Sequence, residues 1–274
     1  MWIASFILFL IAIAGAFVYD RFGTLLRSQL NLILAFGGAF LIGIIFNHLV
    51  PEAYAMNRNA GYVVVFGFLL QGALEYLSQG VEHGHAHHHE AKNAQGNMPW
   101  AMYFSLCLHA FIESMPLSAP EHQGHHEHVH HDHSGHVHLT GIESIDSTLL
   151  VGLILHKFPV ALVLMSMLDA FGVSRGKQWA GLVFFGLTPM LGMLFYNGLL
   201  QSNASWTAVL PEYAGGLLIG ILLHISTTIL FETGDCHRFN RNKMLVTIGW
   251  LALAFLVTAL QRITRLFFSI KRNN

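Results

Sequence analysis

The apolar stretch LLVGLILHKFPVALVLMSML, residues 149–168, is long enough to cross a membrane as one helix. A helix of this length covers about 30 Å, which is the thickness of the hydrocarbon core of a bilayer. His156 and Lys157 lie in the middle of the stretch, where a charged side chain costs roughly 3 kcal/mol on insertion scales. Because such residues usually face a bundle interior or a water-filled cavity, the stretch predicts a membrane span that carries functional side chains.

The composition of the whole chain is typical of a membrane protein. Of its 274 residues, 54% are hydrophobic and 11% are charged, and the mean hydropathy is +0.52. Soluble domains have roughly 25% charged residues. The formal net charge of −1 provides no basic surface for nucleic acid. Cys107 and Cys236 are too few and too far apart for a disulfide framework or a paired-cysteine zinc site.

Similar apolar runs recur along the chain and predict an all-α polytopic membrane protein with eight transmembrane helices. We expect one transmembrane domain over residues 1–274. The first run has no basic residue before it and no convincing cleavage site after it, so we expect a retained helix instead of a signal peptide. The predicted spans cover residues 2–19, 29–50, 61–80, 100–119, 147–170, 179–200, 210–231 and 244–268.

The distribution of basic residues predicts the orientation of the chain. Arg58 is the one basic residue of the N-terminus and the even-numbered links. The odd-numbered links contain Arg21, Arg27, Lys92, Arg175, Lys177, Arg238, Arg241 and Lys243. The positive-inside rule therefore places the odd links in the cytoplasm and both termini outside. Against this, the outer end of the last span carries Arg262, Arg265, Lys271 and Arg272, but earlier helices usually set orientation. Short links and the lack of a long N-terminal targeting segment favour a bacterial inner membrane.

Two histidine-rich loops interrupt the predicted spans, at residues 82–97 and 121–143. Five histidines lie within 83–89 and nine within 122–138. Neutral imidazole binds zinc, copper and nickel, so such segments favour metal capture over the alternative of a solvated linker. On the predicted topology the second loop faces outside, where it would concentrate metal. Its expected ligands are His125, His126, His128, His130, His131 and His133.

A match to an enzyme motif lies in the second loop and is discounted. Residues 126–130 fit H-E-x-x-H, which works only on a helix that presents both histidines on one face. In a segment that is half histidine, such a match arises by chance. A membrane di-iron enzyme would need further histidine boxes at the ends of spans. We therefore expect no enzymatic activity.

The ionisable residues within the fourth and fifth spans predict a metal site. His109 and Glu113 are four residues apart, so they share one helix face and offer nitrogen and oxygen ligands together. His156 can face them from the next span, where Pro159 removes a backbone donor and loosens the helix. Taken alone, each histidine has an alternative role as a hydrogen-bonded structural residue. The combination favours a metal site, since imidazole and carboxylate are zinc ligands.

The order of these motifs resembles the ZIP (Zrt-, Irt-like protein) family of divalent metal transporters over nearly the whole chain. The family pattern His-(Asn/Ser)-x-x-(Glu/Asp)-Gly is similar to HAFIES at residues 109–114. The pattern His-(Asn/Glu)-x-Pro-(Glu/His), with His-Lys in some members, is similar to HKFPV at 156–160. NHLVPE at 47–52 contains the His-x-x-Pro-Glu of relatives, and Glu75 matches a recurrent glutamate.

The resemblance implies a secondary transporter that moves divalent metal into the cytoplasm by alternating access. The histidine content favours zinc as substrate, with iron, manganese or cadmium as alternatives. The resemblance also implies a three-two-three arrangement, in which spans one to three and six to eight form an inverted repeat. His48 and Glu52 would form an entrance relay. His224 stands where relatives carry an acidic residue, so it is either a further ligand or a helix-packing residue. The expected partners are the divalent metal ion and the lipid bilayer, and a second copy of the chain in a homodimer is a further candidate.

The departures from the family pattern concern a second metal ion. Many members hold two metals, but Ala110, Lys157 and Val160 occupy positions where ligands of the second metal would stand. We therefore expect a mononuclear site of His109, Glu113 and His156, in which the positive charge of Lys157 replaces the second cation. Weaker candidates for residues that line the path are Asn47, Ser105 and Cys107.

Two functions from other classes stay open at the level of sequence. A membrane metal sensor or storage protein would bind the ion without moving it, and a transport assay separates this function from transport. A metal exporter of the cation diffusion type would also use paired histidine and acidic residues. Such exporters typically have six spans and a cytoplasmic C-terminal domain, whereas this chain has eight predicted spans and a short tail.

Overall fold

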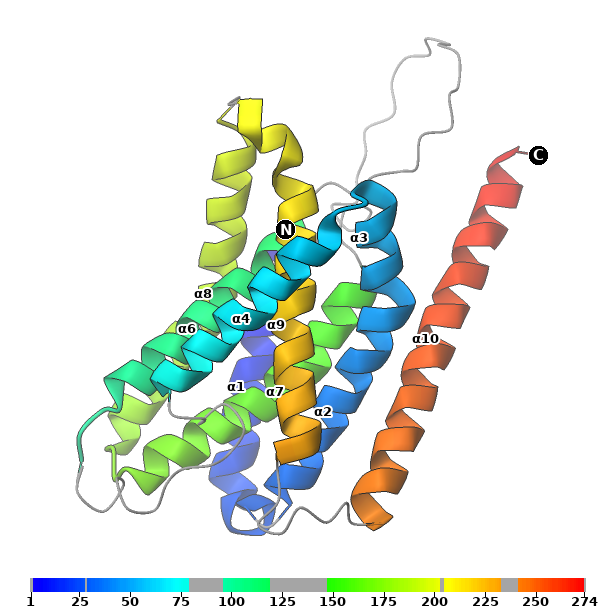
Figure 1. Ribbon diagram of the computed structural model, residues 1–274. Helices are drawn as coiled ribbons and strands as arrows, with labels where there is room; N and C mark the ends of the chain where they lie inside the picture. Colours follow the sequence, from blue (N-terminus) through cyan, green and yellow to red (C-terminus); the bar gives the residue numbers. More distant parts are fainter. Residues whose placement is uncertain are drawn as a thin grey trace.

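The chain folds into a bundle of helices, seen here in a computed structural model (Figure 1). The structure describes residues 2–27, 29–78, 96–118, 147–202, 205–232 and 241–273. The described α-helices are α1 (Trp2–Arg27), α2 (Leu30–Ile44), α3 (Val50–Met56), α4 (Ala60–Ser78), α6 (Trp100–Ser114), α7 (Ser147–Ala170), α8 (Arg175–Leu200), α9 (Leu210–Glu232) and α10 (Arg241–Asn273). The histidine-rich segments 83–89 and 122–138 lie outside the described residues.

The predicted all-α class is confirmed: because α2 and α3 are joined, the nine α-helices of the described residues form eight continuous helices. A π-helical turn, Ile45–Leu49, joins α2 and α3 into one continuous helix. A 3-10 turn, Met115–Ser118, continues α6, and another, Ser205–Val209, precedes α9. Each helix overlaps one of the predicted spans, and α7 has the predicted bounds of 147–170.

Five helices are long and apolar enough to cross a membrane, so the chain is a multi-pass integral membrane protein. These candidate spans are Trp2–Gly23, Leu32–Met56, Ser147–Ala170, Arg175–Leu200 and Leu210–Leu230. The apolar parts of α4 and α10, Ala60–Tyr76 and Met244–Leu260, are shorter. The helix α6, whose α-helical part is 15 residues long and carries the ionisable pair His109 and Glu113, falls in neither group. Eight spans therefore stay a prediction.

The helix α7 occupies the centre of the bundle. It contacts α1 and α2. Of its most apolar 18-residue stretch, 72% is buried inside the bundle, the largest share among the five candidate spans. The helix α6 packs along α8, α4 packs along α9, and α10 lies along α2 (Figure 1). The ionisable residues in the middle of α7 therefore face other helices, as the sequence predicted for side chains at this depth.

The helix ends that border the basic links lie at one end of the bundle. The ends of α1, α4, α7 and α9 and the starts of α2, α6, α8 and α10 gather at the lower end of the molecule in Figure 1. Arg21 and the segment Arg175–Lys177 belong to this end, whereas Arg58 lies between α3 and α4 at the opposite end. We call the lower end the basic end. The positive-inside rule makes it the cytoplasmic end, which stays a prediction.

Candidate metal centre

Two side chains of α6 converge within the bundle as their four-residue spacing predicts. The Nε2 atom of His109 lies 2.9 Å from Oε2 of Glu113, and each side chain is 2% exposed. Both residues occupy the last two turns of α6, which ends at Ser114. A carboxylate withdrawn this far from solvent needs partners that compensate its charge, and these come from the neighbouring helix.

The helix α7 supplies a second histidine and a cation to the same carboxylate. The Nε2 atom of His156 lies 3.8 Å from Oε2 of Glu113, and the Nζ atom of Lys157 donates a hydrogen bond of 2.6 Å to Oε1. The imidazole rings of His109 and His156 lie edge to face, with centroids 5.9 Å apart. The two oxygens of the carboxylate therefore have different partners, since Oε2 faces the two histidines and Oε1 accepts the hydrogen bond from the lysine.

The proline of α7 lies where the neighbouring helix approaches closely. Pro159 has no backbone N–H, so the carbonyl of Leu155 receives no hydrogen bond from it. At this point α2 presents Gly37, where a Cβ atom would stand 3.6 Å from the carbonyl oxygen of Leu155 and 3.6 Å from Cγ of Pro159. These distances are ordinary van der Waals contacts, so α2 packs directly against α7 beside His156. The helix α7 continues through Pro159 from Ser147 to Ala170, so the loosening expected there stays a prediction.

The helix α8 completes the surroundings of the lysine. The ring of Phe185 lies under the Lys157 ammonium, with Nζ 4.5 Å from its centroid, which is a favourable cation–π distance. Pro189 cannot bond the carbonyl of Phe185, and the hydroxyl of Thr188 donates to that carbonyl instead at 2.6 Å. The hydroxyl of Ser114 donates to the carbonyl of Pro189 at 3.0 Å and so ties α6 to α8 beside Glu113.

The group His109, Glu113 and His156 has dimensions that suit a metal ion. One ligand atom from each residue lies within 4.8 Å of the others, and all three side chains are buried. Ligand atoms around a tetrahedral zinc stand about 3.4 Å apart, given bond lengths of about 2.0–2.2 Å. The measured separations of 2.9 and 3.8 Å from Glu113 Oε2 bracket this value. The spacing of the histidine nitrogens from this oxygen is therefore similar to the spacing of ligand atoms around a single zinc ion.

His224 is not a member of this group and pairs with a different carboxylate. Its Nε2 atom lies 2.6 Å from Oε2 of Glu75, and both side chains are about one-sixth exposed. The ring of Phe68 lies edge to face with the imidazole, at 4.6 Å between centroids. Gly72 leaves room for the same imidazole, because a Cβ atom there would stand 3.1 Å from its Cε1. The sequence left His224 as either a further ligand or a helix-packing residue, and the structure places it at the α4–α9 contact.

His48 and Glu52 lie near the end of the continuous helix formed by α2 and α3. The Nε2 atom of His48 is 3.6 Å from Oε2 of Glu52, and Glu52 is the more exposed of the two. The π-helical turn that carries His48 ends just before Pro51. Asn47 closes this irregular turn, since its side-chain amide donates to the carbonyl of Gly43 at 2.8 Å. Asn47 therefore has a local structural contact.

The two weaker candidates on α6 are buried. The hydroxyl of Ser105 donates to the carbonyl of Leu74 at 2.9 Å, which links α6 to α4 one residue before Glu75. Cys107 is a buried free cysteine. The loop histidines predicted to capture metal lie outside the described residues, so their role stays a prediction.

The sequence did not predict the part played by Phe185. Its contact with Lys157 depends on how α8 packs against α7, and a phenylalanine in an apolar helix carries no signal of such a contact. The pairing of Glu75 with His224 was also missed, although each residue was noted separately. In both cases the missing information is the arrangement of helices that are far apart in the sequence.

The fold and the site together define a class of protein. The chain is a multi-span, all-helical membrane protein with a buried group of two histidines and one glutamate that could hold a metal ion. Searches against models of protein families and against curated proteins find no match for the chain.

Proposed function

We propose that this protein is a transporter of divalent metal ions, with zinc as its most suitable substrate. The observation that supports the proposal is the buried group of His109, Glu113 and His156 within a bundle of apolar helices. Ionisable residues at this depth are costly in a membrane and typically mark ion pathways. Two imidazoles and one carboxylate suit zinc, and water molecules can complete the coordination.

The charge of Lys157 supports a site for a single ion. Its ammonium group already holds one oxygen of Glu113 at 2.6 Å, so that oxygen is not available to bridge two metals. Glu113 Oε2 faces the histidines and is the oxygen left for a first metal. A second divalent ion would stand close to the lysine and be repelled by it. The proposal therefore retains the mononuclear site predicted from the sequence.

Two pairs of metal-binding residue types outside the centre suggest the direction of the path. His48 and Glu52 lie toward the end of the bundle opposite the basic end, where they would receive the ion. Toward the basic end, Ser105 lies one turn before His109, and its hydroxyl donates to the carbonyl of Leu74. Leu74 is followed by Glu75, which pairs with His224. We propose that this second pair takes the ion as it leaves the centre.

The resemblance to the ZIP family supports inward movement of the ion by alternating access. It is also the basis of the proposed inverted repeat. Conduction requires a site that binds strongly enough to remove water from the ion and weakly enough to release it. A site with two histidines, one carboxylate and no thiolate meets that requirement better than a thiolate-rich storage site would. The alternative is a sensor, which would bind the ion in the same centre without moving it.

The test is entry of radioactive zinc into proteoliposomes that contain the full-length protein. We expect saturable entry by the wild type, and none by the Glu113→Ala variant, because that variant loses the carboxylate of the centre. Glu212→Ala is the matched control, since Glu212 accepts a hydrogen bond from Asn57 at 3.0 Å and lies outside the centre. Unlabelled iron and manganese serve as competitors that rank the substrates.

Each outcome has a distinct meaning. Near-normal zinc entry through Glu113→Ala would refute the assignment of the centre. Stoichiometric zinc binding by the wild type without any entry would refute transport and leave a sensor or storage protein. Equal loss of entry in Glu113→Ala and Glu212→Ala would show damage to the fold and also count against the assignment.

A further inference from the structure

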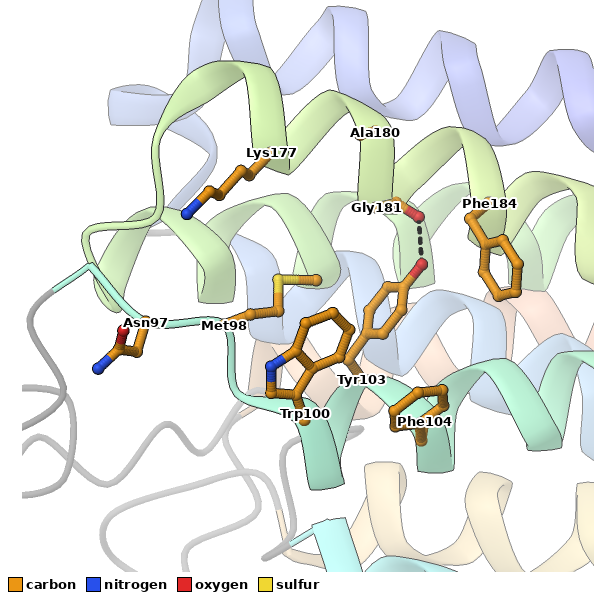
Figure 2. Close-up of a pocket in the computed structure, with 9 residues that line it drawn as sticks. All are labelled: Asn97, Met98, Trp100, Tyr103, Phe104, Lys177, Ala180, Gly181 and Phe184. Atoms are coloured by element: carbon orange, nitrogen blue, oxygen red, sulfur yellow. Dashed lines mark hydrogen bonds between the residues drawn. The ribbon is translucent and has the colours of Figure 1, made fainter.

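A pocket at the basic end of the bundle lies between the starts of α6 and α8, away from the metal centre. Its volume is about 610 Å³, within the range of roughly 300–1,000 Å³ that is usual for small-molecule sites. Figure 2 shows residues of the segment before α6, of α6 and of α8 around one space. The lining residues used below are Asn97, Trp100, Tyr103, Phe104, Lys177 and Phe184.

The walls of the pocket are aromatic and exposed at the surface of the bundle. Trp100, Phe104 and Phe184 are 58%, 57% and 47% exposed, which suits contact with lipid chains and not with water. The rings of Trp100 and Phe104 are stacked, with centroids 5.6 Å apart. The rear wall is fixed by Tyr103, whose hydroxyl donates to the carbonyl of Gly181 at 2.7 Å (Figure 2). Tryptophan is typical of the membrane–water interface, so we expect this wall to lie where acyl chains meet headgroups.

The mouth of the pocket carries a positive charge. Lys177 is exposed in the first turn of α8, and that turn contains no acidic residue. The neighbouring cation Arg175 binds Oδ1 of Asp20 on α1 at 2.9 Å, and Trp179 donates to Oδ2 of the same residue. Asp20 is therefore engaged on the other side of α8. In Figure 2 the side chain of Lys177 extends toward the segment Asn97–Met98 at the mouth of the pocket.

We propose that this pocket binds one anionic phospholipid of the surrounding membrane. Lys177 would hold the headgroup phosphate, with Asn97 as a neutral partner, and one acyl chain would lie along Trp100, Phe104 and Phe184. Basic pockets between transmembrane helices at the cytoplasmic side are suited to anionic headgroups, because charge and apolar surface meet there. The proposal is independent of the metal centre, since none of its residues belongs to that centre.

The test is lipid binding to the full-length protein, measured by native mass spectrometry in detergent. The probes are dioleoyl phosphatidylglycerol, dioleoyl phosphatidylcholine and glycerol phosphate, which represent an anionic lipid, a zwitterionic lipid and a headgroup alone. We expect one phosphatidylglycerol to bind in preference to phosphatidylcholine, and no retained glycerol phosphate. Lys177→Gln should weaken phosphatidylglycerol binding about tenfold, the value of a hydrogen bond to a charged group. Ala180→Trp should fill the pocket and remove the bound lipid.

Arg58→Gln is the matched control, because it removes an exposed cation at the opposite end of the bundle. It should leave the tight phosphatidylglycerol site unchanged. Zinc binding at the metal centre by each variant provides a check that the bundle is intact. Equal affinity of wild type and Lys177→Gln for phosphatidylglycerol would overturn the proposal. So would lipid retention by Ala180→Trp, or an equal loss of binding in Arg58→Gln.

Discussion

At the scale of single residues, Glu113 is the point where three other ionisable side chains meet. Its Oε1 atom is bound by Lys157, and its Oε2 atom faces His109 and His156. Lys157 is 1% exposed, so the pair is withdrawn from water. The loss of one partner of a buried ion pair is costly because it leaves the other charge uncompensated, whereas the loss of both is often tolerated.

We predict that Lys157→Met destabilises the protein by about 3–5 kcal/mol, the usual cost of removing one partner of a buried pair. The double variant Glu113→Gln with Lys157→Met should recover most of this loss while it binds no zinc, because the carboxylate is gone. The measurement is the free energy of unfolding in mixed micelles, combined with zinc binding at equilibrium. A double variant no more stable than Lys157→Met would contradict the compensation of charge between the two residues.

Much of the centre could be predicted from single residues in the sequence. His109 and Glu113 follow from a four-residue spacing on one helix face, and His156 from its position at mid-depth in the next apolar run. Phe185 could not be predicted, since its contact with Lys157 requires the packing of α8. For the same reason the sequence named His224 without its partner Glu75.

At the scale of helices, glycines set the close contact of α4 with α9. A Cβ atom at Gly220 would collide with the backbone of Val64 and Phe68, and one at Gly67 with the backbone of Leu217. The hydrogen-bonded pair of Glu75 and His224 spans the same contact. Side chains cannot be inserted between backbones this close, so larger residues must move the helices apart.

We predict that Gly220→Ala lowers the melting temperature and the rate of zinc entry, because it separates α4 from α9 and lengthens the distance between Glu75 and His224. Gly215→Ala on the same helix is the control, since a Cβ atom there has no neighbour within 4 Å among the described residues. Thermal unfolding and transport rates of the two variants are compared. Similar behaviour of both variants would show that the close contact of α4 and α9 has no part in stability or transport.

The positions of the helices were largely predictable, because apolar runs and short polar links delimit them. The π-helical turn at Ile45–Leu49 was not predicted. Pro51 signals that a backbone donor is missing, but the sequence does not show how the helix adjusts. In the structure the helix continues through the π-helical turn, and one turn before Pro51 the side-chain amide of Asn47 donates to the carbonyl of Gly43. The short α-helical part of α6 was also missed, since the apolar run continues through Met115 and Leu117.

At the scale of the whole molecule, the loop 122–138 and the centre have separate expected roles. We predict that deletion of 122–138 raises the apparent KM for zinc and leaves the maximal rate of entry unchanged. The reason is that the loop would raise the local zinc concentration, whereas the centre carries the ion across. Initial rates in proteoliposomes over a range of zinc concentrations measure both quantities. A large fall in the maximal rate at constant KM would place the loop in the translocation machinery.

The ion pair of Lys157 with Glu113 would also set how a transporter of the proposed kind responds to membrane voltage. With both histidines neutral, the empty centre has no net charge, and a divalent ion gives it a charge of +2. Each elementary charge that crosses 100 mV changes the free energy by about 2.3 kcal/mol. A negative interior would thus favour inward movement of the loaded centre by up to about 4.6 kcal/mol per 100 mV. The return of the empty centre would be electrically silent, so the lysine places the whole voltage dependence in the metal-loaded step.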